Sequence, residues 1–192
     1  MAADDSFPIA RLLPSLASLD QSKIDLITSL FEPVSLKKDQ IFIQKGEKVT
    51  KVAYVVKGTL TRFNDHEKGH MIIDQFLVPN QFFSDRIGYF SQGSSATTIQ
   101  ANSACLLWTL SLNAIKELSN TIPEFSEIIN SIIKETLNHD LDLKELFSIK
   151  DPLQRILRFY ELYPHSWSDI PKKYLPCYLQ MSKGLFYQCQ KK

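Results

Sequence analysis

The feature that most restricts the fold is a series of short β-type segments between residues 34 and 110. These segments are rich in Val, Ile, Phe and Tyr, and they occupy residues 40–43, 52–56, 60–64, 71–76, 97–101 and 104–110. Turn-forming sequences separate them at residues 45–47, 57–58, 65–69 and 79–81. Short strands at this spacing predict an antiparallel sandwich, barrel or jelly roll. The absence of a long helix between them argues against a nucleotide-binding parallel sheet.

Helical periodicity precedes this region. The first 31 residues are predicted to be helical, because apolar residues recur there at helical spacing. The first apolar set is Leu12, Leu13, Leu16 and Leu19. A second short helix has Ser22 as its predicted N-cap, and its apolar face comprises Ile24, Ile27, Leu30 and Phe31. Pro33 ends this pattern.

A long amphipathic helix is predicted after the β-type region. Ser111 is a predicted cap for a short helix that extends to Leu118, and Pro123 then opens the longer one. An apolar stripe continues along it for about six turns. Its members expected at a two-fold dimer seam are Phe125, Ile128, Ile129, Ile132, Ile133, Leu137 and Leu141. Packing of the stripe on the β domain of the same chain is the alternative.

The last 40 residues form a distinct helical pattern. Asp151 and Pro152 begin a predicted helix that ends before Pro164, and Pro171 occupies a predicted first helical position of the next. The apolar residues of these two helices are Ile156, Leu157, Phe159, Tyr160, Tyr174, Leu175, Tyr178 and Leu179. Ser182 is the predicted N-cap of a last helix over residues 183–192. Two short helices around a tight turn predict a helix-turn-helix.

This order of elements resembles the Crp/Fnr family of transcription regulators, in the divergent branch common in Bacteroidetes-type bacteria. The motifs that carry the resemblance are Lys-Gly-Glu at 45–47, Tyr-Val-Val-Lys-Gly-Thr-Leu at 54–60, Asp-Pro-Leu-Gln-Arg-Ile-Leu-Arg-Phe-Tyr at 151–160, Tyr-Pro at 163–164 and Ile-Pro-Lys-Lys-Tyr-Leu at 170–175. The resemblance implies an α+β fold: N-terminal helices and a cyclic-nucleotide-binding-type, double-stranded β-helix (jelly-roll) sensor domain over residues 1–122. A dimerisation helix over 123–149 and a helix-turn-helix DNA-binding domain over 150–192 complete it. Because the sequence ends at Lys192, we expect the family's β-hairpin wing to be missing.

The resemblance places an effector pocket where the family has a Phe-Gly-Glu and Arg-(Ser/Thr)-Ala cassette. The matching residues are Phe83, Ser84, Asp85, Arg86, Ser94, Ser95 and Ala96. Ser94 replaces the phosphate-binding arginine, a loss of about 3 kcal/mol or more for a buried phosphate. Arg86 is an alternative source of positive charge. The cofactor is therefore unknown: we expect the usual cAMP binding to be lost, and the pocket to hold another small-molecule effector or none.

The resemblance also assigns DNA contacts to the last two helices. The predicted contacts are Lys172, Lys173, Ser182, Lys183, Tyr187, Gln188 and Lys191. The family places a glutamate, a serine or threonine, and an arginine at the positions of Gly184, Tyr187 and Gln188. The lysines can bind phosphates without reading sequence, and the glutamine can still bond adenine. Pro176 is expected to kink or break the first helix of the pair.

Composition narrows the function further. A net charge of +1 points to no particular partner, and no apolar run is long enough to span a membrane. An acidic N-terminus without a signal sequence predicts a cytoplasmic protein, and three cysteines without metal-type spacing predict reduced thiols. We expect neither a metal site nor enzymatic activity. The main hypothesis is a homodimeric transcription regulator; the alternative is a sensor or protein-interaction module that has lost specific DNA binding.

Overall fold

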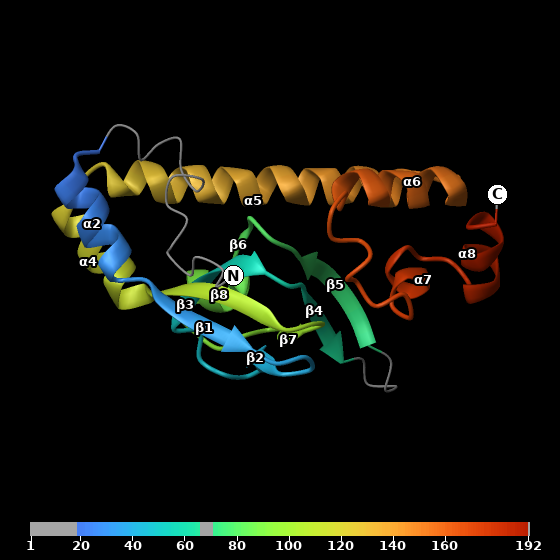
Figure 1. Cartoon of the computed structure of the whole chain (residues 1–192), viewed down its shortest axis with the longest axis horizontal. Coiled ribbons are helices and arrows are strands. Elements are labelled where there is room, and N and C mark those ends of the chain that lie inside the picture. Colours follow the sequence, from blue (N-terminus) through green and yellow to red (C-terminus); the bar gives the residue numbers. More distant parts are fainter. Residues whose placement is uncertain (1–18, 66–70, 192) are drawn as a thin grey trace, which may run out of the picture.

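The computed structural model describes residues 19–65 and 71–191, which form a β-roll flanked by helices (Figure 1). The strands are β1 (Glu32–Leu36), β2 (Ile41–Ile43), β3 (Lys51–Lys57), β4 (Leu60–Asp65), β5 (Met71–Leu77), β6 (Phe82–Phe83), β7 (Thr98–Ala101) and β8 (Cys105–Ser111). They form two antiparallel four-stranded sheets in the orders β1-β8-β3-β6 and β2-β7-β4-β5. The predicted antiparallel β-roll is confirmed, and each of the six predicted strands occurs within one residue of its expected ends.

Strands β1 and β6 were not among the predicted strands. Strand β1 contains Pro33, which was expected only to end a helix. It pairs with β8 alone and therefore lies at a sheet edge, where the missing amide of a proline is tolerated. Strand β6 has two residues, Phe82 and Phe83, and is too short to show an alternating pattern.

The turn between β3 and β4 depends on Gly58. Its φ angle is +84°, in the left-handed region that favours glycine. A Cβ atom at this position would lie 2.5 Å from the Ala104 carbonyl oxygen and 2.7 Å from Sγ of Cys105. A glycine is thus required here both by the backbone conformation and by the close approach of the turn between β7 and β8.

The helices are α2 (Gln21–Ser29), α3 (Arg86–Ser91), α4 (Leu112–Thr121), α5 (Phe125–Ser148), α6 (Pro152–Leu162), α7 (Leu175–Tyr178) and α8 (Lys183–Cys189). The predicted caps Ser111 and Ser182 are confirmed, since each side chain accepts a hydrogen bond from the first turn of its helix. The helix predicted to begin at Asp151 and Pro152 is also confirmed, and Asp151 is its cap. The prediction of Ser22 as the cap of α2 is wrong. Asp20 caps that helix by accepting from the Lys23 amide, and Ser22 donates to the Asp20 carboxylate instead. Leu12, Leu13 and Leu16 lie outside the described residues.

The C-terminal helix pair differs from its prediction in two places. Helix α7 begins at Leu175, so Pro171 precedes it and Pro176 lies in its first turn. A proline there removes no intrahelical hydrogen bond, which is why Pro176 does not kink the helix as expected. Helix α8 ends at Cys189 rather than at residue 192. Lys192 lies outside the described residues.

Within residues 19–65 and 71–191, three hydrophobic cores hold the fold together. One fills the β-roll, and a second joins α2, α4 and the start of α5. The third is shared between the β-roll and the C-terminal helices, because Phe76 and Val78 lie among residues of α5 to α8. Figure 1 shows α5 along one side of the β-roll, with α2 and α4 at one end and α6 to α8 at the other. Helices α6 to α8 are therefore packed onto the β-roll and not merely attached by the chain.

Among residues 19–65 and 71–191, no helix combines the length and the hydropathy that crossing a bilayer requires. All three cysteines are free, with Cys105 buried and Cys177 exposed.

Candidate functional sites

The segment from β6 through α3 to β7 contains the predicted effector cassette. Asp85 is buried and caps α3: its carboxylate accepts hydrogen bonds from the Gly88 amide at 2.8 Å and from the Thr97 hydroxyl at 2.7 Å. Ser84 donates to the Lys51 carbonyl at 3.0 Å. These bonds join β3, α3 and β7, so both side chains have partners within the protein.

The pKa of Asp85 reflects these internal bonds. Burial raises the pKa of the carboxyl, whereas the hydrogen bonds from the Gly88 amide and the Thr97 hydroxyl lower it. The net effect is a pKa below the ordinary value of an aspartate. Asp85 is thus a stable anion that connects the start of α3 to Thr97. Its carboxylate oxygens accept hydrogen bonds from groups of the protein itself.

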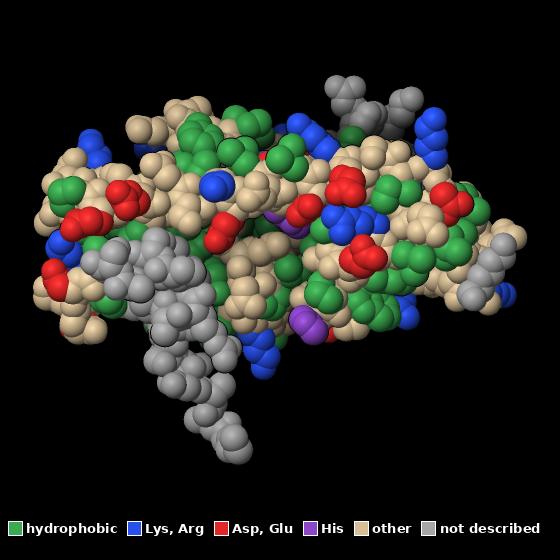
Figure 2. Space-filling model, turned by 90° about the horizontal axis from the view of Figure 1, so that it is seen from above, with side chains coloured by type: hydrophobic (Ala, Val, Ile, Leu, Met, Phe, Trp, Pro, Cys, Tyr) green, Lys and Arg blue, Asp and Glu red, His purple; other side chains and the backbone are tan. Residues whose placement is uncertain are grey.

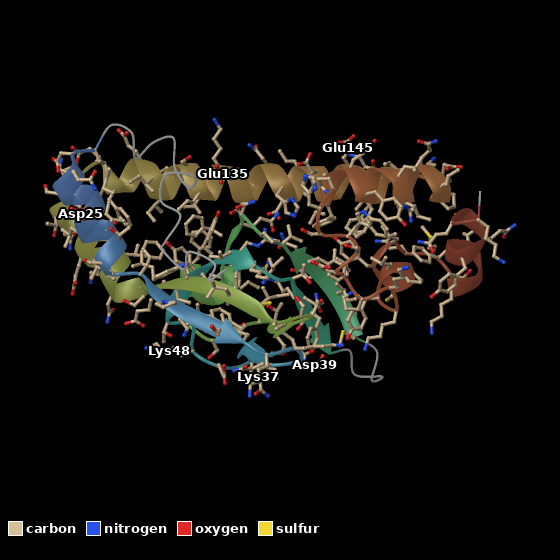
Figure 3. All side chains as sticks on the ribbon, viewed as in Figure 1. Asp25, Lys37, Asp39, Lys48, Glu135 and Glu145 are labelled. Atoms are coloured by element: carbon tan, nitrogen blue, oxygen red, sulfur yellow. The ribbon has the colours of Figure 1, made fainter. Side chains whose placement is uncertain are left out.

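The second half of the cassette lies apart from the first. Ser94 is exposed and forms an antiparallel bridge with Lys48, which is labelled in Figure 3. Ser95 is buried and donates to the Thr97 carbonyl at 2.7 Å. Neither Ser94, Ser95 nor Ala96 lines the cavity described next, and Asp85 does not line it either. The structure brings only Phe83, Ser84 and Arg86 of the predicted set together there.

A cavity of about 140 Å³ lies between the β-roll, α3 and α5. Its wall is mostly apolar, with side chains such as Leu77, Phe83, Tyr89, Phe90, Ile132 and Leu137. The polar exceptions are Arg62, Gln75, Ser84, Arg86 and Thr136. The cavity is therefore mostly apolar, with Arg62 and Gln75 on strands β4 and β5, Arg86 on α3 and Thr136 on α5.

Arg62 is the buried charge of this cavity, and sequence analysis missed it. It lies on β4 and is 4% exposed. Its guanidinium donates to Oε1 of Gln75 at 3.0 Å and to the Ser84 carbonyl at 2.9 Å. Burial lowers the pKa of this guanidinium, and the Asp74 carboxylate opposes that effect. One feature of the sequence could have indicated this residue: an arginine in the middle of the predicted strand 60–64.

Arg86 connects α3 to α5. It forms an ion pair with Asp140 across the gap between the two helices. Because its charge is matched there, it is not free to replace the phosphate arginine at Ser94. The ion pair instead joins α3 to α5, the two helices that line the cavity.

The β-roll resembles a known protein domain. Residues 33–121 match the family model of the cyclic nucleotide-binding domain. This part of the chain is a domain of the cyclic nucleotide-binding type. Comparison with curated proteins gave no match.

Solved structures extend the likeness beyond this domain. FixK2 from Bradyrhizobium japonicum has 16% identity and a TM-score of 0.70, with 84% of this chain and 83% of that chain covered. The catabolite activator protein of Thermus thermophilus has 16% identity and a TM-score of 0.55, with 93% and 85% covered. CLP from Xanthomonas campestris, a c-di-GMP responsive global regulator, has 14% identity and a TM-score of 0.64, with 90% of each chain covered. These neighbours are Crp/Fnr-type regulators, and at such identities the likeness is one of fold.

The apolar stripe of α5 divides between two environments. Phe125 and Ile128 are buried in the core with α2 and α4, and Ile129, Ile132 and Ile133 line the cavity beside the cyclic nucleotide-binding-type domain. Leu137 and Leu141 are 56% and 60% exposed. Intra-chain packing thus accounts for the first half of the stripe but leaves the second half uncovered.

Exposed apolar residues of α3 add to the uncovered half of α5. Ile87 and Phe90 are largely exposed, and Phe90 lines the same cavity as Leu137. Figure 2, seen from the α5 side, shows hydrophobic side chains gathered beside the middle of this helix. We call Ile87, Phe90, Leu137 and Leu141 the α3–α5 face.

Five of the predicted DNA contacts lie in α8 or directly beside it, whereas Lys172 and Lys173 precede α7. Lys172, Lys173, Lys183, Tyr187, Gln188 and Lys191 are exposed, and Ser182 caps α8. The buried side of α8 is anchored by Phe186. Gly184 has no atom within 4 Å of the position a Cβ would take, so a side chain there would point into open space. Helix α8 thus presents an outer surface of lysine, tyrosine and glutamine without the glutamate of the family pattern.

Proposed function

We propose that the chain is a Crp/Fnr-type transcription regulator, which acts as a homodimer and couples a signal at the β-roll to DNA binding by α8. One observation carries the proposal: a single helix, α5, walls the cavity with Ile132 and presents Leu137 and Leu141 to solvent. A change in the cavity would therefore reach the surface that a second copy would cover. Motion requires that the signal bind two dimer arrangements with different affinities.

The DNA-binding part of the proposal rests on the position of α8. Its N-terminus is capped by Ser182, and its outer surface carries side chains suited to phosphates and base edges. A two-fold dimer implies a palindromic operator with half-sites about one helical turn apart. We expect such a palindrome to be enriched when the purified chain selects DNA from a random library over a series of salt concentrations.

Two lysine variants make this experiment specific. Lys183→Ala removes a cation at the start of α8, and we expect lower affinity for all sequences and a salt slope smaller by about 1. Lys116→Ala is the control, because Lys116 is exposed on α4 at the opposite end of the molecule (Figure 1). Equal effects of the two substitutions would mean that α8 does not contact DNA.

The alternative function is a sensor or protein-interaction module without specific DNA binding. The open position at Gly184 favours it, because the side chain expected to contact a base is missing there. The same selection separates the two functions. Uniform weak binding that disappears at moderate salt would support the module, since phosphate contacts alone carry no sequence information.

Dimerisation is tested on the α3–α5 face. We expect the double substitution Leu137→Glu with Leu141→Glu to weaken the dimer about 100-fold or more, because two charges would have to be buried at the interface. The measurement is sedimentation equilibrium, which distinguishes the 22.0 kDa chain from its dimer. Leu157→Glu is the control, since Leu157 is 45% exposed but lies on α6. A monomeric wild-type chain would contradict the prediction.

A further inference from the structure

The cavity between the β-roll and α5 has a size and a lining that restrict its ligand. At about 140 Å³ it is comparable to the roughly 150 Å³ apolar cavity, in an unrelated protein, that accepts benzene. A cyclic nucleotide, with its base, ribose and phosphate, exceeds this volume and would have to extend past Phe90 and Leu137, which are exposed where the cavity opens to solvent. The wall also offers few polar partners for ribose hydroxyls. The cavity therefore fits a small body, about the size of one aromatic ring or a short alkyl chain.

The charge at one end of the cavity is incompletely matched. Arg62 is bonded to two neutral oxygens, those of Gln75 and the Ser84 carbonyl. Its nearest anion is Asp74, 3.6 Å away, and that carboxylate is 48% exposed and solvated. The buried Nε atom of Arg62 has no hydrogen-bond partner. A buried cation with a spare donor favours an anionic partner.

Arg86, the second arginine of the wall, does not compete for that partner. Its charge is matched by Asp140 on α5. The cavity thus offers one guanidinium whose ion pair with Asp74 is long and solvated and whose Nε donor has no partner, which suits one negative charge on an apolar body. A carboxylate suits a single planar guanidinium, whereas a phosphate dianion would need more donors than the wall provides.

We propose that this cavity binds a small apolar monocarboxylate, with its carboxylate on Arg62 and its apolar body between α3 and α5. The proposal rests on the proposed function in taking the ligand to be the effector. The ligand would contact Phe83 and Phe90 of the β-roll side and Ile132 of α5 at once. Its occupancy would favour one position of α5 and so one arrangement of the α3–α5 face.

The first test is calorimetric titration of the full chain with benzoate, phenylacetate and hexanoate, each beside its neutral amide, and with cAMP. We expect at least one carboxylate to bind at least tenfold more tightly than its amide and more tightly than cAMP. Equal binding of acid and amide, tighter binding of cAMP, or no binding of any carboxylate would overturn the proposal.

Variants locate the binding. Arg62→Met is expected to lower carboxylate affinity about 100-fold and to lower amide affinity by much less, because the carboxylate loses a charged partner and the amide loses only a hydrogen bond. Thr136→Phe, which fills part of the cavity with a ring and keeps the arginine at position 62, should abolish both. It also keeps the test decisive if Arg62→Met does not fold. The control is Glu135→Phe, at an exposed position of α5 labelled in Figure 3. Carboxylate binding that survives Thr136→Phe would contradict this location.

Failure of this proposal is separable from failure of the proposed function. Calorimetry requires no DNA, so carboxylate binding without palindrome enrichment would support the ligand and contradict the regulator. Palindrome enrichment without carboxylate binding would support the regulator and contradict the carboxylate ligand.

Discussion

Replacing Phe76 with alanine is expected to lower the free energy of unfolding by about 3–5 kcal/mol, the usual cost of deleting a buried phenylalanine ring. Phe76 is fully buried on β5, where its ring centroid lies 4.6 Å from that of Tyr178 and 6.3 Å from that of Phe159. The substitution would leave a cavity between the β-roll and the C-terminal helices. Urea unfolding monitored by fluorescence measures the change.

The control for Phe76→Ala is on the same strand. Ile72 is 51% exposed, so Ile72→Ala should change the free energy of unfolding by about 0.5 kcal/mol or less. Hydrogen exchange adds a local measurement: in Phe76→Ala, amides of α7 and α8 should lose protection before those of the β-roll. Similar costs for the two variants would mean that the third core does not join the two parts.

The shared core limits how a signal can reach α8. A tethered C-terminal unit could rotate freely, whereas this one is packed through Tyr163, Phe159 and Tyr178 against Phe76. Reorientation of α8 therefore requires either undocking of this core or movement of β5 and α5 together with it. Movement of β5 and α5 together with the core exposes no apolar surface to solvent, because a packed core can change from one close-packed arrangement to another. It also agrees with a ligand held between the β-roll and α5.

The β-roll could be predicted from the sequence because its information is local. Strand β8, for example, shows alternating burial along Cys105–Ser111, and Gly58 marks the turn that only glycine fits. The caps Ser111, Asp151 and Ser182 are local for the same reason, since each bonds an amide three residues later. Asp20 and Ser22 are both residue types that cap helices, and they lie two positions apart at the start of α2. The sequence pattern alone does not show which of them is the N-cap.

The cavity could not be predicted, because it depends on contacts between distant segments. Arg62 meets Gln75 and Ser84 only after β4, β5 and β6 have been placed in the β-roll. The resemblance directed attention to Ser94 instead, which lies outside the cavity wall. The sequence likewise placed Phe76 in a predicted strand but did not predict its contacts. Its packing on α6 and α7 depends on the folded arrangement of the chain.

Arg155 is expected to be the main polar link of the C-terminal helices. It lies on α6, and its guanidinium donates to the Ile149 carbonyl at 2.6 and 2.9 Å and to the Leu179 carbonyl at 2.7 Å. It thereby joins the end of α5 to the turn that precedes α8. Arg155→Ala should lower the free energy of unfolding by about 2–4 kcal/mol, because bonds from a charged donor are lost and two carbonyls lose their partner.

Arg158→Ala is the matched control, three residues along the same helix. Arg158 also contacts several groups, but these are the exposed carboxylates of Asp142, Glu145 and Glu161 (Glu145 is labelled in Figure 3). Surface ion pairs contribute about 1 kcal/mol or less and are weakened by salt. We therefore expect Arg155→Ala to be the more destabilising variant in urea unfolding at both low and high salt. If the two variants cost the same, or if salt removes the effect of Arg155→Ala, then the bonds to Ile149 and Leu179 do not hold α8 in place.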